Sequence, residues 1–200
     1  MKIWGTKYFG HDSALATIDF DKKEIFAIST ERVNKGEICR LLHGRMEFGP
    51  RALGNRSIVA NPALTNATKK INLTVKRRPE FQPFCPSILE EERERLFERS
   101  FPHKHMATAF RLKEKFVKDI PSAAHIDLTA RPQFVDRADN PNFYRYLKHL
   151  KKLNGYGVSI NTSFNLHGRT VVRTAEDAII DFIDCNLDAL FIEGYEVRRK

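Results

Sequence analysis

The chain has 200 residues, of which 42% are hydrophobic and 30% are charged. This length suits one sizeable domain and is short for two, and the composition is that of a globular chain rather than a disordered one. No apolar run approaches the roughly 18 residues of a membrane span, and the first residues lack the pattern of a signal peptide. We therefore expect a cytoplasmic protein without a membrane segment.

The formal net charge is +9 at pH 7. This excess of basic residues indicates an anionic partner, and both nucleotide phosphates and nucleic acid would satisfy it. A basic surface without a specific ligand is the alternative. The three cysteines are widely spaced and form no CxxC pair, which favours free thiols in a reducing compartment over disulfides or a zinc site.

The first 38 residues are predicted to form a β-rich ribbon. Three strands are expected, over residues 1–8, 14–20 and 24–30. A turn at 10–13 and a hairpin connection at 21–23 would join them. Residues 33–40 contain Asn34 and Gly36 and show no helix or strand period, so they are predicted to be a junction.

Helices and strands alternate over the rest of the chain, which predicts an α/β (α+β) fold. Helical spacing of apolar residues predicts helices over 62–77, 90–100, 141–153 and 174–184. Strands are expected over 81–88, 108–116, 133–135, 158–162 and 189–193. Capping boxes are expected to begin two of the helices, Ser87 with Glu90 and Thr174 with Asp177.

Residues 44–57 hold three glycines and three arginines within fourteen positions. Glycines allow the backbone to approach a ligand, and arginine guanidinium groups match phosphate oxygens two at a time. The segment lacks the GxxxxGK[ST] spacing of a P-loop. It therefore predicts either an anion site or a glycine-rich turn whose arginines pair with Glu47 and other acids.

Two further segments carry polar groups that could bind a phosphate. Asn161 to Asn165 follow the apolar strand expected at 158–160, although a polar turn or helix cap is a commoner use of such residues. Arg131 could reach a phosphate, with His125 and Asp127 as a hydrogen-bonded pair, or this could be a surface loop. His103 and His105 suggest a metal only weakly, because no third ligand is nearby.

Four segments together resemble a known family, the O-carbamoyltransferases of the nodulation-factor and antibiotic-tailoring type. They are GRMEFGPRALGNRS, INLTVKRRPEFQPFCPS, HIDLTARPQFV and NTSFNLHG, which occur in the order and spacing of that family. The resemblance covers roughly residues 39–195. It implies that residues 39–200 form the family's C-terminal domain, with a YrdC-like twisted mixed sheet and flanking helices.

Residues 8–32 also resemble the opening strands of that family's N-terminal domain, which is related to actin and the sugar kinases. Several hundred residues separate the two stretches in full members, and about ten do here. The resemblance therefore implies that residues 1–38, the short N-terminal β-ribbon, are a remnant of the actin-like carbamoyl-transfer domain.

The family binds ATP, with Mg²⁺, and carbamoyl phosphate, and forms carbamoyl adenylate with release of phosphate and pyrophosphate. Its N-terminal domain then transfers the carbamoyl group to a hydroxyl, using an iron held by histidines and an aspartate. We expect no metal site in this chain, because the stretch with the iron ligands is missing. A companion protein could supply it.

Carried over position by position, the resemblance implies catalytic roles for Lys76 and Arg131. Its substrate and nucleotide ligands correspond to Arg51, Arg56, Lys76, Arg131, Asn161, Ser163 and Asn165. The chain departs from the family at Gln82, where an arginine is usual. If that arginine contacts a phosphate, its absence costs on the order of 1.5–3 kcal/mol of charge-assisted bonding.

Three interpretations stay open. The chain could retain ATP and carbamoyl phosphate binding with partial adenylate formation, or it could be an inactive remnant or one subunit of a split enzyme. It could instead be a basic RNA-binding module with a YrdC-like fold, although nucleic acid is the less expected partner. The acceptor hydroxyl is not indicated by these residues.

Overall fold

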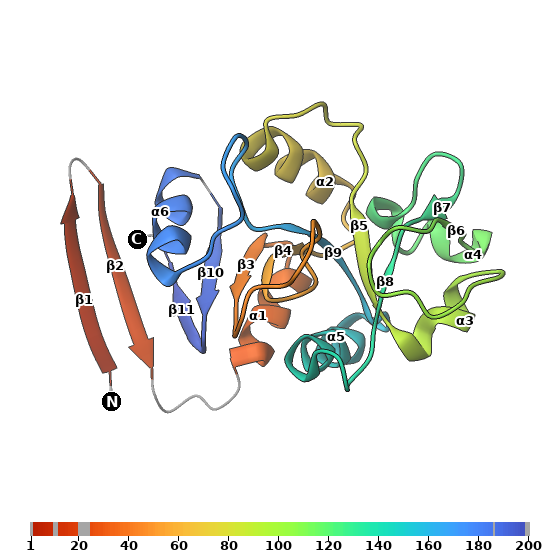
Figure 1. The fold of residues 1–200 in the computed structure, drawn as a ribbon, viewed down its shortest axis with the longest axis horizontal. Coiled ribbons are helices and arrows are strands. Elements are labelled where there is room, and N and C mark those ends of the chain that lie inside the picture. Colours follow the sequence, from red (N-terminus) through yellow and green to blue (C-terminus); the bar gives the residue numbers. More distant parts are fainter. Residues whose placement is uncertain (1, 10–11, 20–24, 186, 199–200) are drawn as a thin grey trace.

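The computed structural model describes residues 2–9, 12–19, 25–185 and 187–198. A seven-stranded mixed sheet in the order β11-β10-β3-β4-β9-β5-β8 forms its centre (Figure 1). The strands are β3 (Cys39–Leu42), β4 (Arg56–Ala60), β5 (Cys85–Leu89), β8 (Gln133–Val135), β9 (Val158–Ser163), β10 (Ala189–Ile192) and β11 (Tyr195–Val197). β10 pairs parallel with β3 and β5 with β8, and the other neighbours are antiparallel. This mixed sheet confirms the predicted α/β class.

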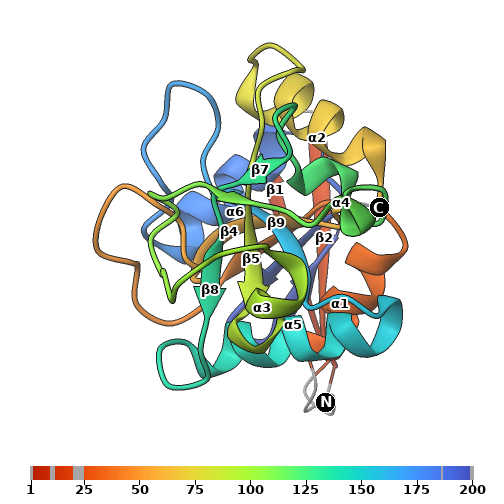
Figure 2. The ribbon, with the colours of Figure 1, turned by 90° about the vertical axis from the view of Figure 1, so that its right-hand side faces the viewer.

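Helices cover both faces of the sheet (Figures 1 and 2). The principal helices are α1 (Ile25–Asn34), α2 (Thr65–Ile71), α5 (Pro141–Asn154) and α6 (Ala175–Asp184). Side chains of successive strand residues point to opposite faces. In β4, Ile58 and Ala60 pack in one hydrophobic cluster with α2 and α6, whereas Val59 packs with α1 and α5. The sheet is therefore buried on both sides.

Smaller elements complete the chain around the end of the sheet that carries β5 and β8. They are a π-helix (Asn72–Lys76), 3-10 turns (Glu90–Glu92 and Pro121–Ala123), α3 (Arg93–Leu96), α4 (Glu114–Val117), β6 (Phe110–Arg111) and β7 (Thr129–Ala130). A third hydrophobic cluster, including Phe97, Phe110 and Phe134, lies beneath them. This cluster supports the segments that border the candidate site.

Local capping signals explain where α5 and α6 begin. The Asn140 side chain accepts a hydrogen bond from the backbone N–H of Phe143, and Gly155 ends α5 with a positive φ of 81°. Thr174 and Asp177 form the predicted capping box at the start of α6. Both helices match their predicted ranges, because these caps satisfy backbone groups that a helix end leaves unpaired.

The N-terminal ribbon is confirmed only in part. β1 (Lys2–Phe9) pairs antiparallel with β2 (Asp12–Asp19), and β2 lies beside β11. The strand predicted over 24–30 is wrong, since α1 occupies residues 25–30 and continues into the predicted junction as far as Asn34. α1 packs on α5, and Val33 is fully buried there, so tertiary packing overrides local β propensity. Of the turn predicted at 10–13, residues 12 and 13 lie in β2, and residues 10 and 11 lie outside the described residues, as does the connection at 21–23.

Three other predictions in the region of β5 and β8 are wrong or only partly right. Ser87 does not cap a helix, because it lies in β5 and its hydroxyl donates to Gln133 Oε1 at 2.6 Å. The expected helix over 90–100 is reduced to a 3-10 turn and the short α3. Only residues 110–111 of the strand predicted over 108–116 are extended, and α4 follows them.

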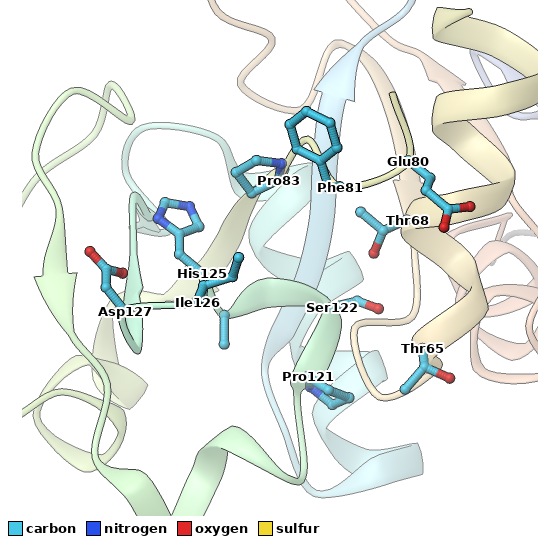
Figure 3. A pocket seen from close by; sticks show the side chains of 11 residues that line it. Thr65, Thr68, Glu80, Phe81, Pro83, Pro121, Ser122, His125, Ile126 and Asp127 are labelled. Atoms are coloured by element: carbon cyan, nitrogen blue, oxygen red, sulfur yellow. The ribbon is translucent and has the colours of Figure 1, made fainter. Parts of the chain in front are cut away.

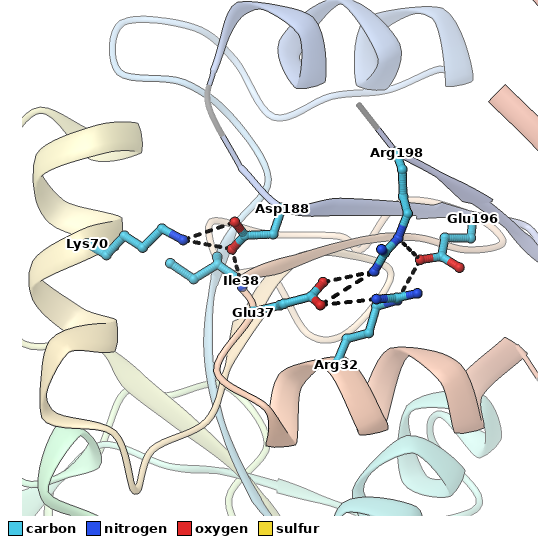
Figure 4. A network of polar contacts seen from close by, with 7 residues as sticks. All are labelled: Arg32, Glu37, Ile38, Lys70, Asp188, Glu196 and Arg198. Carbon is cyan, nitrogen blue, oxygen red and sulfur yellow. Dashed lines mark hydrogen bonds and ion pairs between the residues drawn. The ribbon is translucent and has the colours of Figure 1, made fainter. Parts of the chain in front are cut away.

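A polar network joins α1 to the last strand (Figure 4). Glu37 accepts from Arg32 at 3.0 Å and from Arg198 at 3.1 Å, and Arg32 also pairs with Glu196 at 2.6 Å. A second group beside it consists of Lys70, Asp188 and the backbone N–H of Ile38. Together they fix the start of β3 and the end of the chain against the same edge of the domain.

The three cysteines, Cys39, Cys85 and Cys185, are free and buried, as their spacing predicted. No helix in the described part of the chain is both long enough and apolar enough to cross a membrane.

Candidate functional site

Strand register brings the predicted polar segments to one end of the sheet. β9 lies between β4 and β5 and runs antiparallel to both. Ser163 at the end of β9 is therefore opposite Ser57 near the start of β4, and Asn161 is opposite Cys85 at the start of β5. The loop before β4 and the segment before β5 meet at this edge.

A pocket of about 230 Å³ opens at this position. Four of the predicted ligands line it: Arg51 of the loop before β4, Arg131 of the turn between β7 and β8, and Asn161 and Ser163 of β9. Gln82 lines it as well. The pocket therefore unites residues from all four segments that carry the family resemblance, and Met106 completes the wall.

Sequence reasoning missed Arg78, a third arginine in this pocket. Arg78 Nε donates to Asn72 Oδ1 at 2.6 Å, and its guanidinium lies 4.2 Å from the centre of the Phe84 ring. These contacts hold the group at the pocket wall. The signal for it was its place two residues after Lys76 in the basic cluster at the end of the predicted helix. Among the residues that the structure describes, the lining thus contains three arginines and no acidic residue.

Lys76 lies behind this wall, at the end of the π-helix. Its ammonium donates to the Ser163 carbonyl at 2.6 Å, to Ser163 Oγ at 3.1 Å, and to Asn165 Oδ1 and O at 2.8 and 3.1 Å. Burial, together with the nearby charges of Arg78 and Arg40, lowers the pKa of Lys76 to about 7. Lys76 therefore holds the Ser163–Asn165 turn in place and sets a titratable charge behind the pocket.

Asn161 belongs to a buried network that positions the arginine loop. Its amide donates to the Ala52 carbonyl at 3.0 Å and to Ser87 Oγ at 2.9 Å. Gln133 Nε2 donates to the next carbonyl of the loop, that of Leu53, at 2.9 Å. These bonds fix the residues directly after Arg51. Among the described residues, Asn161 Oδ1 is a buried acceptor without a hydrogen-bond donor.

The sequence left open whether Glu47 pairs with the arginines of the glycine- and arginine-rich loop. In the structure, this carboxylate binds backbone N–H groups of the loop. Glu47 Oε1 accepts the backbone N–H groups of Leu53, Asn55 and Arg56 at 2.7, 2.7 and 3.1 Å. Its carboxylate therefore stabilises the turn itself. Arg51 lines the pocket.

Besides Lys76, two of the predicted ligands lie outside the pocket lining. Arg56 is 5% exposed, and its guanidinium donates to backbone carbonyls of the loop before β4 and of Arg173. This geometry joins two loops and leaves the side chain enclosed. Asn165 lies behind Ser163, whose hydroxyl donates to Asn165 Oδ1 at 2.6 Å.

The other candidate residues have local partners. His125 and Asp127 do not pair with each other, because both contact Thr129, at 3.2 Å and 2.7 Å respectively. Burial and the nearby charge of Arg131 lower the pKa of His125. His103 Nε2 accepts the N–H of Ala107 at 3.0 Å. Across the described ranges, no group of three or more His, Cys, Asp or Glu side chains could hold a metal ion.

Solved structures place the architecture in the YrdC-like class. The chain superposes on Pyrococcus abyssi Sua5 complexed with L-threonine with a TM-score of 0.56 and 16% identity, over 86% of this chain and 47% of that one. It superposes on full-length HypF in its phosphate- and nucleotide-bound form with a TM-score of 0.57 and 16% identity, over 99% and 26%. These similarities concern the fold.

The family model of the carbamoyltransferase C-terminus matches residues 30–199, and the chain belongs to this family. Methanocaldococcus jannaschii MJ1058 is 68% identical over all of this chain and 34% of its own length. Nodulation protein NolO of Bradyrhizobium diazoefficiens is 35% identical over 88% and 33%. The 3'-hydroxymethylcephem-O-carbamoyltransferase of Streptomyces clavuligerus is 33% identical over 72% and 27%. The chain spans about a third of the length of these relatives.

Proposed function

We propose that this chain is the part of an O-carbamoyltransferase that binds ATP and carbamoyl phosphate and forms carbamoyl adenylate. One observation carries the proposal: Arg51, Arg78 and Arg131 line one pocket, and no acidic residue of the described chain lines it. Forked guanidinium groups neutralise and orient phosphate oxygens, which is the main task of a protein that joins two polyanions.

The reaction balances as two substitutions. Water converts carbamoyl phosphate to carbamate and inorganic phosphate. A carbamate oxygen then attacks the α-phosphorus of ATP, and the bond to pyrophosphate breaks. In both steps the protein positions the reactants and neutralises their charge, and it forms no covalent bond to them.

Each site residue then has a defined part in the proposal. Arg51, Arg78 and Arg131 bind the phosphate oxygens, and Ser163 and Asn161 contribute neutral polar groups. Lys76 positions Ser163 and adds a charge behind it. ATP brings its Mg²⁺, which keeps water and phosphate ligands and needs no carboxylate from this pocket. Arg56 has a structural part: its guanidinium joins the loop before β4 to Arg173 through hydrogen bonds to backbone carbonyls.

Transfer to a hydroxyl acceptor is proposed for the complete enzyme rather than for these residues alone. The relatives are about three times as long as this chain, and the resemblance assigns transfer and its iron to their other domain. The division at residues 38 and 39, with a companion domain completing the reaction, stays a prediction.

The test is carbamoyl-phosphate-dependent release of pyrophosphate from ATP by the purified chain, together with ATP binding by calorimetry. Arg131→Ala should weaken ATP binding by about 1.5–3 kcal/mol, because it removes a charge-assisted phosphate contact. Arg145→Ala, an exposed arginine on α5, is the matched control and should bind as the parent does. No pyrophosphate release combined with no ATP binding would refute the proposal.

A further inference from the structure

Asn72 is the first residue of the π-helix and is fully buried, although its side chain is polar. Short π-helical segments are frequently found at functional sites. The backbone carbonyl of Asn72 accepts the N–H of Arg77 and, at 3.1 Å, the N–H of Arg78. These bonds end the π-helix, and Arg77 then turns the chain in the left-handed region with a φ of 44°. Asn72 therefore determines where Arg78 leaves the helix.

The side-chain amide of Asn72 contacts three groups that follow it in the chain. Its Nδ2 donates to the backbone carbonyls of Glu80 at 3.0 Å and of Gln82 at 2.9 Å. Its Oδ1 accepts from Arg78 Nε at 2.6 Å. Exchanging the amide nitrogen and oxygen would place a donor against a donor and an acceptor against two acceptors. These partners therefore allow the amide only one orientation.

The segment that Asn72 holds borders two pockets (Figure 3). Gln82 lines the arginine pocket, and Pro83 lines both this pocket and a neighbouring one of about 620 Å³. Glu80 and Phe81 line the neighbouring pocket. Because Asn72 Nδ2 binds the carbonyls of Glu80 and Gln82, one buried amide fixes this wall of the arginine pocket.

Arg78 is held on two sides. Its Nε donates to Asn72, and its guanidinium lies 4.2 Å from the centre of the Phe84 ring. Within the described ranges, its terminal nitrogens Nη1 and Nη2 donate to no protein acceptor, and Arg78 lines the arginine pocket. These nitrogens form a fork that matches two phosphate oxygens. The bond to Asn72 therefore uses the one nitrogen that this fork does not need.

We propose that Asn72 is a positioning residue of the arginine pocket, whose amide sets the direction of Arg78 and the place of Gln82 relative to it. The inference rests on the proposed function, because it takes the arginine pocket to be the phosphate site. Asn72 acts through these neighbours, since it is not among the described residues of the lining. Holding a cationic fork in its binding geometry before the anion arrives reduces the entropy that binding must overcome.

The test is a double-mutant cycle on the 200-residue chain, with tripolyphosphate binding measured by calorimetry. Asn72→Leu keeps the approximate size of the side chain and removes its amide. It should weaken binding about tenfold or more, the effect of losing one charge-assisted hydrogen bond to the anion. In an Arg78→Ala background the same substitution should weaken binding by no more than about threefold. In an Arg131→Ala background its full effect should remain, because Arg131 comes from another segment.

Thr74 offers a matched control in the same π-helix. Its hydroxyl also donates to a backbone carbonyl, that of Lys70, at 2.6 Å, but the residue is exposed. Thr74→Ala should leave tripolyphosphate binding unchanged. A loss of affinity equal to that of Asn72→Leu would show that any weakening of the π-helix acts on the pocket, and the inference would be wrong.

A measurement on the parent chain tests the same geometry without relying on a variant at Asn72. The Nε–H of Arg78, assigned by NMR through its loss in Arg78→Lys, should exchange with water more slowly than that of Arg145, an exposed arginine on α5. It should stay protected when tripolyphosphate binds, because the terminal nitrogens contact the anion. Exchange as fast as that of Arg145, or protection lost on binding, would overturn the inference.

Each other result has one meaning. If Asn72→Leu folds and binds tripolyphosphate as the parent does, the inference is wrong and the proposed function stands. If it weakens binding equally with and without the Arg78 side chain, Asn72 supports only the fold, and the inference again fails. If Asn72→Leu does not fold, the exchange of the Arg78 Nε–H decides. If the parent chain binds neither ATP nor tripolyphosphate, the proposed function itself fails.

Discussion

Lys76 couples the candidate site to pH. The residue is 7% exposed and its ammonium donates to oxygens of Ser163 and Asn165, yet burial brings its pKa down from 10.5 to about 7. Between these two values the unfolded chain binds a proton that the folded chain has released. Protonated Lys76 therefore destabilises the folded state by its full amount below pH 7. This destabilisation decreases as the pH rises above 7.

Replacing Lys76 with methionine should remove this pH dependence. Relative to the variant, the free energy of unfolding of the parent should rise by about 1.4 kcal/mol per pH unit between pH 8 and 9. The hydrogen bonds lost in the variant add an offset that does not vary with pH, so the slope alone decides. Urea denaturation at several pH values measures it, and parallel curves for the two proteins would show that Lys76 does not titrate in this range.

Gln82 is an exposed neutral residue within a pocket of arginines. Gln82→Arg should tighten tripolyphosphate binding by about 1.5–3 kcal/mol, because a charge-assisted hydrogen bond replaces a neutral one. Gln82→Met keeps the length of the side chain without a charge and serves as the control. Calorimetry should separate the two variants. Equal affinities would mean that this position does not contact the anion.

At the level of elements, the helices with complete local signals were predictable. Asn140 with Pro141, and Thr174 with Asp177, begin α5 and α6 where the sequence places them. α1 was predicted as a strand because its β-branched and aromatic residues favour strands, and its packing on α5 reverses that preference. Ser87 resembled a cap, but its hydroxyl is used within the buried network around Gln133.

The candidate site was predictable to a similar degree. β9 is antiparallel to both of its neighbours, and this register helps to bring together Asn161, Ser163, Arg131 and Arg51. The sequence of a single segment does not reveal how the strands pair. Arg56 has the same residue type as Arg51, but it lies within β4 and faces backbone carbonyls. Sequence spacing alone cannot distinguish an arginine that faces a pocket from one that joins loops.

Gly54 links the arginine loop to α5. Its φ is 118°, and a Cβ at this position would lie 2.4 Å from Cγ of Phe143. Gly54→Ala should destabilise the fold by about 3 kcal/mol, combining backbone strain with overpacking. Urea denaturation provides the measurement.

Gly44 offers a matched control in the same loop. It also has a positive φ, of 53°, but a Cβ there meets nothing within 4 Å. Gly44→Ala should therefore cost only about 1–2 kcal/mol, the strain of a left-handed residue. Equal losses in the two variants would show that contact with Phe143 is unimportant.

Across the whole molecule, the positively charged side chains differ in how closely acidic side chains lie to them. Surface cations such as Lys148 and Arg169 pair with acids, Glu91 and Asp181 respectively, whereas the pocket concentrates arginines without an acid in its lining. This arrangement favours a local polyanion over a long one spread across the surface. It is the physical reason to rank a nucleotide above RNA as the partner.

Ligand binding should therefore stabilise the entire domain. At an ATP concentration about 100 times the dissociation constant, the free energy of unfolding should increase by about 2.7 kcal/mol. A domain of this size should then melt roughly 5–10 °C higher. Thermal denaturation followed by circular dichroism tests this, with Arg131→Ala as the variant in which the shift should shrink. An unchanged melting temperature at saturating ATP would contradict the nucleotide site.

The three buried cysteines give the chain a built-in reporter of occupancy. Cys85 lines the arginine pocket, whereas Cys39 lies in the core with a pKa raised by burial, and the Cys185 thiol donates to the Asp181 carbonyl. Because Cys85 lines the pocket, the pocket gives a small thiol-labelling reagent a route to this residue in the folded protein. A bound nucleotide would block that route, so the rate of labelling would follow binding without any attached dye, and the two silent thiols would become reactive only when the domain unfolds.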